Sequence, residues 1–143
     1  MNSEGIENIM NEFIYKKGSA LFQCWQYKLD QGNPSLTVEG QPFRFYKKCI
    51  GLERYRTDCL TKDESQQYLL DGLPAEERIA YQRTSGDPNQ FMGQLVVPVY
   101  EGKKLVGFIE LTTHKPKKDY ADEFLRLSSL LKREGLATKG LTV

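Results

Sequence analysis

The chain has 143 residues, 39% of them hydrophobic and 27% charged, and its formal net charge is +1 at pH 7. This size suits one domain over residues 1–143, with enough apolar residues for one real core. A chain without a basic or acidic excess gives no reason to expect binding to nucleic acid, and its longest apolar run, residues 95–100, is far too short to cross a membrane.

An amphipathic pattern opens the chain. Apolar residues recur from Ile6 to Ile14 at helical spacing, which places them on one stripe of a helix. Ser3 is a suitable N-cap for this helix, and Gly18 is a suitable residue to end it. We therefore expect a helix that begins after Ser3 and ends before Gly18.

Two strands are expected next. Residues 20–29 combine aromatic and other apolar residues with no helix-like caps, which favours a strand. After the turn-rich residues 30–34, residues 35–46 predict a second strand that is interrupted by Gly40 and Pro42. We expect these two strands to pair as an antiparallel hairpin.

The middle of the chain, residues 47–94, has no clear period. A short helix is predicted at about 63–71, with Asp63 as its cap and Gly72 as its stop. Residues 76–84 fit a helix or a strand equally well, so both remain open.

The clearest pattern lies near the C-terminus. Residues 94–100 and 104–112 are apolar runs joined by a short turn, where Gly102 permits a positive φ, so they predict two paired strands. A final amphipathic helix follows, with Asp119 as its N-cap and Gly135 beyond its end.

This C-terminal third resembles the end of a GAF domain. The matching positions are Pro98 in the first strand, Gly102 in the turn, Gly107 and Glu110 in the sequence VGFIEL of the second strand, and the helix start at residues 120–123. The resemblance implies an α+β fold of GAF/PAS-like build. In such a fold an antiparallel sheet carries the N- and C-terminal helices, packed together, on one face. Other α+β domains, PAS-like or profilin-like, are the alternative.

Three cysteines, Cys24, Cys49 and Cys59, do not form an obvious disulfide framework, because their number is odd and the N-terminus has no signal-peptide pattern. The chain has no CxxC motif, and its one histidine is His114, so it lacks the ligands of a Cys/His zinc site. We expect free thiols, no cofactor and a cytoplasmic location.

One specific class of enzyme is an alternative function. The free methionine sulfoxide reductases are GAF-like enzymes with three working cysteines, and the spacing of Cys49 and Cys59 resembles two of them. The third cysteine of that family lies shortly before the strand matched by residues 94–100, and it is absent here. The chain also has no GxSxG, P-loop or GxGxxG motif. We therefore expect a protein that is not an enzyme.

Basic residues are concentrated in residues 44–62. Arginine forks and tyrosine hydroxyls suit a carboxylate, phosphate or nitrate-like anion, or a nucleic-acid backbone, and the alternative is a solvated charged face. In a GAF-like fold the ligand pocket lies between the sheet and the middle of the chain. The candidate ligand-binding residues, each of which also fits ordinary packing or a surface position, are Arg54, Arg56, Tyr68, Tyr81, Arg83 and Phe91.

The resemblance implies a small regulatory or sensory module. It would bind a small ligand, anionic or aromatic, or a protein partner to which its signal is passed in trans. Terminal helices of GAF proteins often mediate dimers, and both helices expected here carry apolar stripes, so a homodimer is expected. A protein-interaction adaptor without a ligand is the alternative function.

Overall fold

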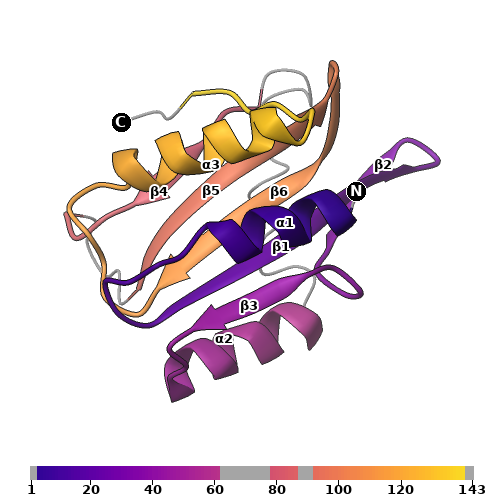
Figure 1. The fold of residues 1–143 in the computed structure, drawn as a ribbon. Coiled ribbons are helices and arrows are strands. Elements are labelled where there is room, and N and C mark those ends of the chain that lie inside the picture. Colours follow the sequence, from indigo (N-terminus) through magenta and orange to yellow (C-terminus); the bar gives the residue numbers. More distant parts are fainter. Residues whose placement is uncertain (1–2, 62–77, 87–91, 141–143) are drawn as a thin grey trace.

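The computed structural model describes residues 3–61, 78–86 and 92–140, and its fold is α+β (Figure 1). In this part of the chain one antiparallel sheet has the strand order β2-β1-β6-β5-β4, and β3 pairs with β1 beside β2. The predicted α+β class with an antiparallel sheet is therefore confirmed. The elements are α1 (Ser3–Glu12), β1 (Ala20–Asp30), β2 (Asn33–Thr37), β3 (Phe43–Tyr46), α2 (Ile50–Thr61), β4 (Tyr81–Arg83), β5 (Gly93–Glu101), β6 (Lys104–Thr113) and α3 (Ala121–Arg133).

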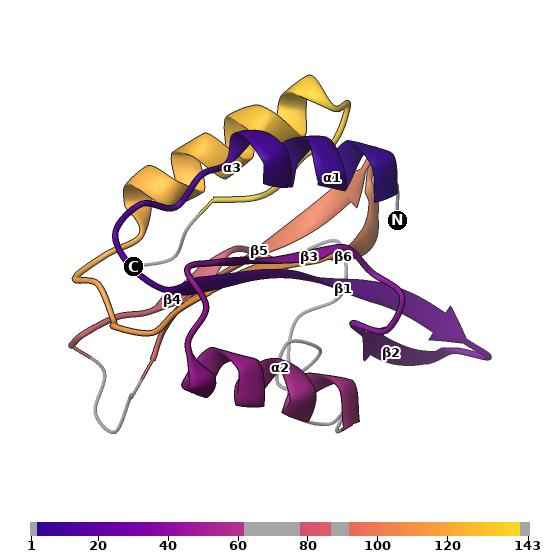
Figure 2. The same ribbon diagram turned by 60° about the horizontal axis from the view of Figure 1, so that its bottom comes forward.

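The two faces of the sheet carry different helices. Figure 2 shows α1 and α3 side by side on one face and α2 on the other. Because successive side chains of a strand point to opposite faces, β1 supplies Phe22 and Cys24 to the core under α1 and α3, and Trp25 to the core under α2. The terminal helices thus pack on one face, as the sequence predicts.

The α1 side is a conventional apolar core. Ile6, Ile9 and Phe13 are buried there, and the Phe13 ring meets the Phe22 ring edge-on at 5.8 Å. Helix α1 ends at Glu12, earlier than the predicted stop at Gly18. Its apolar stripe therefore does not extend to Ile14, which is 49% exposed.

The predicted second strand is in fact two strands. Gly40, with φ +75°, lies between β2 and β3, and both strands pair with the same edge of β1. The interruption that Gly40 and Pro42 indicated in the sequence is therefore a break in the strand. The β5–β6 hairpin agrees with its prediction, and Gly102 adopts φ +62° in the turn.

Helix α2 was not predicted. Its buried residues are Leu52, Arg56 and Cys59, one face at helical spacing with an arginine at its centre. A charged residue on the buried face leaves no apolar stripe, which is the signal on which helix prediction depends. The helix predicted at 63–71 lies outside the described residues, and β4 shows that 81–83 form a strand.

The final helix begins at Ala121, and its N-cap position is Tyr120, not Asp119. The Asp119 carboxylate nevertheless accepts a hydrogen bond from the Ala121 amide at 3.0 Å, so it satisfies one of the free amides of the first turn. None of the helices in the described ranges has both the length and the apolar character that crossing a membrane requires.

Candidate functional site

A fully buried carboxylate lies at the centre of the α2 face of the sheet. Glu110 of β6 is 0% exposed. Its Oε1 accepts hydrogen bonds from Trp25 Nε1 at 2.7 Å and from Gln23 Nε2 at 3.1 Å, and its Oε2 accepts one from the Thr112 hydroxyl. Burying a charge without such partners costs several kcal/mol, roughly, so these three donors are what make the position tolerable.

Two chains of hydrogen bonds connect this carboxylate to α2. On one side the Gln23 Oε1 accepts a hydrogen bond from Arg56 Nη1 at 2.8 Å. On the other side Gln94 Nε2 lies 3.4 Å from the Thr112 hydroxyl and 3.2 Å from the Tyr55 hydroxyl. We call this set the Glu110 network; its members are Gln23, Trp25, Tyr55, Arg56, Gln94, Glu110 and Thr112.

Strand register explains why these side chains meet. Gln23 pairs directly across from Glu110, and Gln94 pairs directly across from Thr112. Cross-strand neighbours on one face have Cβ atoms only about 5 Å apart, so polar side chains at these positions reach one another without strain. The network therefore spans β1, β6 and β5, and it anchors α2 through two consecutive residues.

Arg56 combines burial with an unused donor. It is 6% exposed, and its guanidinium lies over the Phe43 ring at 4.0 Å. Burial lowers the pKa of Arg56, and the charge of Glu110 acts in the opposite direction. Its Nε is buried with no hydrogen-bond partner in the part of the chain that the structure describes. An unsatisfied buried donor costs about 1–3 kcal/mol.

Replacing Arg56 with alanine should destabilise the fold by about 2 kcal/mol, because it removes a charged hydrogen bond and leaves Gln23 and Glu110 without their cation. Arg54, two positions earlier on the exposed side of α2, provides a matched control, for which Arg54→Ala should change stability by less than about 0.5 kcal/mol. Urea unfolding of both variants measures the difference, and equal losses would contradict an anchoring role for Arg56.

The structure places half of the predicted ligand-binding residues on the same face of the sheet. Arg56 lies on the buried face of α2, and Tyr81 packs against the apolar cluster under α2. Arg83 pairs across from Gln94 and, two residues after Tyr81, lies on the same face of β4. Arg54 lies on the exposed side of α2. Of the remaining predicted residues, Tyr68 and Phe91 lie outside the described residues.

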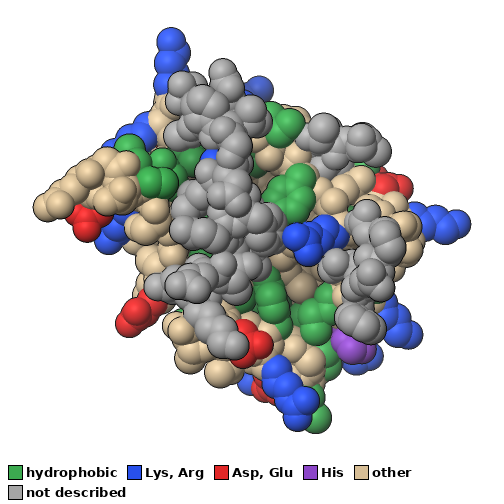
Figure 3. Space-filling view, turned by 180° about the vertical axis from the view of Figure 1, so that it is seen from behind, with side chains coloured by type: hydrophobic (Ala, Val, Ile, Leu, Met, Phe, Trp, Pro, Cys, Tyr) green, Lys and Arg blue, Asp and Glu red, His purple; other side chains and the backbone are tan. Residues whose placement is uncertain are grey.

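The basic residues of 44–62 do not share one surface. Arg44 donates to the Asn11 side chain at 2.5 Å, beside α1, whereas Arg56 lies on the buried face of α2. The space-filling view from behind, the side opposite α1 and α3, shows hydrophobic side chains in the middle of this face and a basic side chain among them (Figure 3). A cation beside an apolar surface suits a small organic anion better than a nucleic-acid backbone.

The three cysteines are free and far apart. Cys49 directly precedes α2 and Cys59 lies near its end, so ten residues of helical rise, about 15 Å, separate them. Disulfide formation needs Cα atoms about 4.4–6.8 Å apart. Cys24 lies in the core under α1 and α3, on the opposite face of the sheet, where burial raises the pKa of its thiol. This arrangement does not favour a pair of exchanging thiols.

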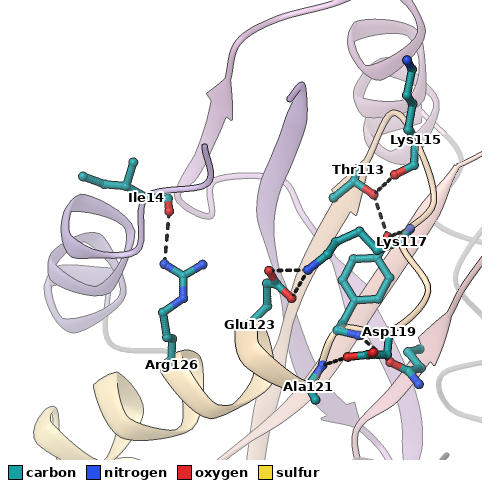
Figure 4. Close-up of polar contacts among 10 residues, drawn as sticks. Ile14, Thr113, Lys115, Lys117, Asp119, Ala121, Glu123 and Arg126 are labelled. Carbon is teal, nitrogen blue, oxygen red and sulfur yellow. Dashed lines mark hydrogen bonds and ion pairs between the residues drawn. The ribbon is translucent and has the colours of Figure 1, made fainter. Parts of the chain in front are cut away.

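A second polar cluster lies at the start of α3 (Figure 4). The Lys117 ammonium contacts both oxygens of the buried Glu123 carboxylate at 2.6 Å. The Tyr120 and Thr113 hydroxyls lie 2.7 Å apart, and Arg126 donates to the Ile14 carbonyl at 3.1 Å. These contacts fix the connector before α3 and the segment after α1, so their primary effect is on packing. The described residues contain no group of three or more His, Cys, Asp or Glu that could hold a metal ion.

Sequence reasoning did not identify most of the Glu110 network. A signal was nevertheless present, because Gln23, Gln94 and Glu110 are polar residues inside otherwise apolar strand segments. Such residues are buried only with hydrogen-bond partners, so three of them on neighbouring strands indicate a shared network. What the sequence could not indicate was that α2 would supply Tyr55 and Arg56.

Comparison with known proteins gives no family for this chain. No protein-family model matches it, and no curated protein and no solved structure matches it significantly. The resemblance to GAF domains therefore stays a prediction, based on the residues of the β5–β6 hairpin and the start of α3.

Proposed function

We propose that the chain is a small sensory module that binds a small organic anion on the α2 face of its sheet. The observation that carries the proposal is Arg56, a buried cation that leaves one donor unsatisfied beside the Glu110 network. Arg83 adds a second guanidinium on the same face. Arginine forks bind carboxylates in a bidentate manner, so a carboxylate-bearing metabolite is the class of ligand that fits best.

The Glu110 network also suggests how binding would be transmitted. A ligand that contacts Arg56 contacts the residue that connects α2 to Gln23 and, through it, to Glu110. A ligand that favours one arrangement of this connection shifts the population of α2 positions. A separate partner protein that binds α2 would then respond to this shift, so the signal would pass in trans.

Thermal unfolding tests the proposal. The probes are succinate, glutamate and citrate, with neutral succinamide as a control for the charge. A ligand that binds only the native state stabilises it, so at least one carboxylate should raise the melting temperature by several degrees, and succinamide should not.

Two matched variants locate the effect. Arg56→Lys keeps the charge and a donor for Gln23 but lacks the spare Nε, so its melting temperature should not respond to the carboxylate. Arg54→Lys, on the exposed side of α2, should respond like the parent protein. A parent protein that responds to none of the probes, or an Arg56→Lys variant that still responds, would overturn the proposal and favour an adaptor without a ligand.

The cellular compartment, the choice of a binding module over an enzyme, and the oligomeric state are also proposals. The free cysteines suit a reducing compartment such as the cytoplasm, and their separation is a reason to propose a binding module over a thiol enzyme.

Dimerisation through the terminal helices has less support from the packing of these helices than from their sequence pattern. Most of their apolar stripes pack on the sheet, and the large apolar residues that stay exposed beside them are Ile14 and Leu125.

A further inference from the structure

A separate cavity lies at one end of the sheet, away from the α2 face network. The first residue of β1, Ala20, pairs with Tyr46 at the end of β3 and with Thr113 at the end of β6. The start of β1 and the ends of these two strands therefore meet. The cavity beside them has a volume of about 260 Å³. Its lining residues are Tyr15, Lys17, Gly18, Ser19, Lys47, Thr113, His114 and Lys115.

The residues that line this cavity are basic, although Tyr15 and Lys17 also line a neighbouring hollow with Glu12, Asp122 and Glu123. Three lysines and one histidine line the cavity itself, and none of its lining residues is acidic. Within the described residues, no ion pair is recorded for Lys17, Lys47 or Lys115. Glu123, the carboxylate that acts on Tyr15, is paired with Lys117 at 2.6 Å. Three unpaired ammonium groups at one opening therefore present a local positive charge.

Tyr15, which lines the cavity, carries a neutral hydrogen-bond donor. Tyr15 is 6% exposed, and its hydroxyl has no recorded hydrogen bond with any residue that the structure describes. Burial raises the pKa of Tyr15 to about 12, so the hydroxyl keeps its proton at neutral pH. By contrast, the neighbouring Thr113 hydroxyl is satisfied, because it donates to the Lys115 carbonyl at 2.7 Å (Figure 4).

Two backbone conformations shape the opening. Lys47 has φ +56°, in the left-handed region that side chains other than glycine rarely adopt. Gly18, which also lines the cavity, has φ +132°, which only glycine adopts readily. A strained residue that is basic and borders a cavity is typical of a binding site, where the surrounding fold holds the strain.

We propose that this cavity binds a phosphate group, either as free phosphate or as part of a small phosphomonoester. Its volume is below the roughly 300–1,000 Å³ of pockets for larger organic ligands. Lysine binds phosphate as a compact point charge, and several lysines match its double negative charge better than they match a single carboxylate. In this site the Tyr15 hydroxyl donates a hydrogen bond to one phosphate oxygen, and Lys17, Lys47 and Lys115 contact the other oxygens.

Calorimetric titration at low ionic strength tests the site with inorganic phosphate, glycerol 3-phosphate and acetate as probes. Binding of either phosphate compound, with acetate at least about tenfold weaker, is the expected result. Stronger binding of glycerol 3-phosphate than of inorganic phosphate would identify a phosphomonoester as the ligand, and the reverse would identify free phosphate.

Variants assign the binding to this cavity. Tyr15→Phe keeps the ring in the core and removes only the hydroxyl, and the double variant Lys47→Gln, Lys115→Gln removes two rim charges. Each should weaken phosphate binding by about tenfold, the usual effect of one charged hydrogen bond. Lys104→Gln, at the opposite end of β6, is the matched control and should bind like the parent protein.

Two results would overturn the proposal. No heat of binding with either phosphate compound at 10 mM or so, in a folded parent protein, would exclude a useful site. Binding that both sets of variants leave unchanged would place any phosphate elsewhere. These results do not depend on the carboxylate response of the α2 face, because none of the altered residues belongs to the Glu110 network.

Discussion

Replacing Glu110 with alanine should cost about 3–5 kcal/mol of the free energy of unfolding, as expected when one partner of a buried polar network is removed. The alanine leaves Trp25 Nε1 without its acceptor at 2.7 Å, and the Gln23 and Thr112 donors lose theirs as well. Each unsatisfied buried donor costs roughly 1–3 kcal/mol. Because typical domains are stable by about 5–15 kcal/mol, this one substitution should come close to unfolding the protein.

Glu110→Gln separates hydrogen bonding from charge. A glutamine oxygen can still accept from Trp25 and Gln23, so the loss should be only about 1–2 kcal/mol. Glu101→Ala is the control, because Glu101 is an exposed carboxylate in the same hairpin and its loss should cost less than about 0.5 kcal/mol. Urea unfolding of the three variants gives the comparison. Equal stability of Glu110→Ala and the parent protein would show that the network contributes nothing to folding.

Gly93→Ala should be the second strongly destabilising substitution, with a loss of about 3 kcal/mol, at the upper end of the usual effect of overpacking. Gly93 is the first residue of β5, and a Cβ there would overlap the Tyr120 hydroxyl and lie 2.7 Å from Pro116 Cα. Tyr120 is 0% exposed and its hydroxyl meets that of Thr113, so it cannot move without disturbing the start of α3. Thermal unfolding measures the loss.

A second substitution shows which contact is responsible. Tyr120→Phe removes the overlapping hydroxyl, so Gly93→Ala should cost less in that background, although the contact with the Pro116 backbone remains. Gly140→Ala is the control, because a Cβ there meets nothing within 4 Å. If Gly93→Ala proved as harmless as Gly140→Ala, the close packing of β5 against the connector before α3 would be wrong.

The parts of the fold with a regular apolar pattern could be predicted from the sequence, and these include the β5–β6 hairpin and the terminal helices. Helix α2 could not, because its buried face contains Arg56 and the helix depends on partners that are distant in sequence. Gln23 is 33 residues from Arg56, and Glu110 is 87 residues from Gln23. Local periodicity carries no information on such pairings.

The candidate site could also be predicted from the sequence only in part. Arg56, Tyr81 and Arg83 were identified by residue type, since cations and aromatic side chains suit an anionic or aromatic ligand. Glu110 was noted only for its position in the GAF-like pattern, because an acidic residue gives no reason to expect an anion site. Its role follows from three-dimensional contacts, in which it orients Gln23, and Gln23 in turn holds Arg56.

The indole resonance of Trp25 tests the central claim most directly. The chain has one tryptophan, so its Nε1–H gives one signal in a ¹H–¹⁵N spectrum, and this group donates to Glu110. Titration with the carboxylate that raises the melting temperature should shift this signal in the parent protein and in Arg54→Lys, but not in Arg56→Lys. A signal that stays in place while amides elsewhere shift would contradict ligand binding on the α2 face.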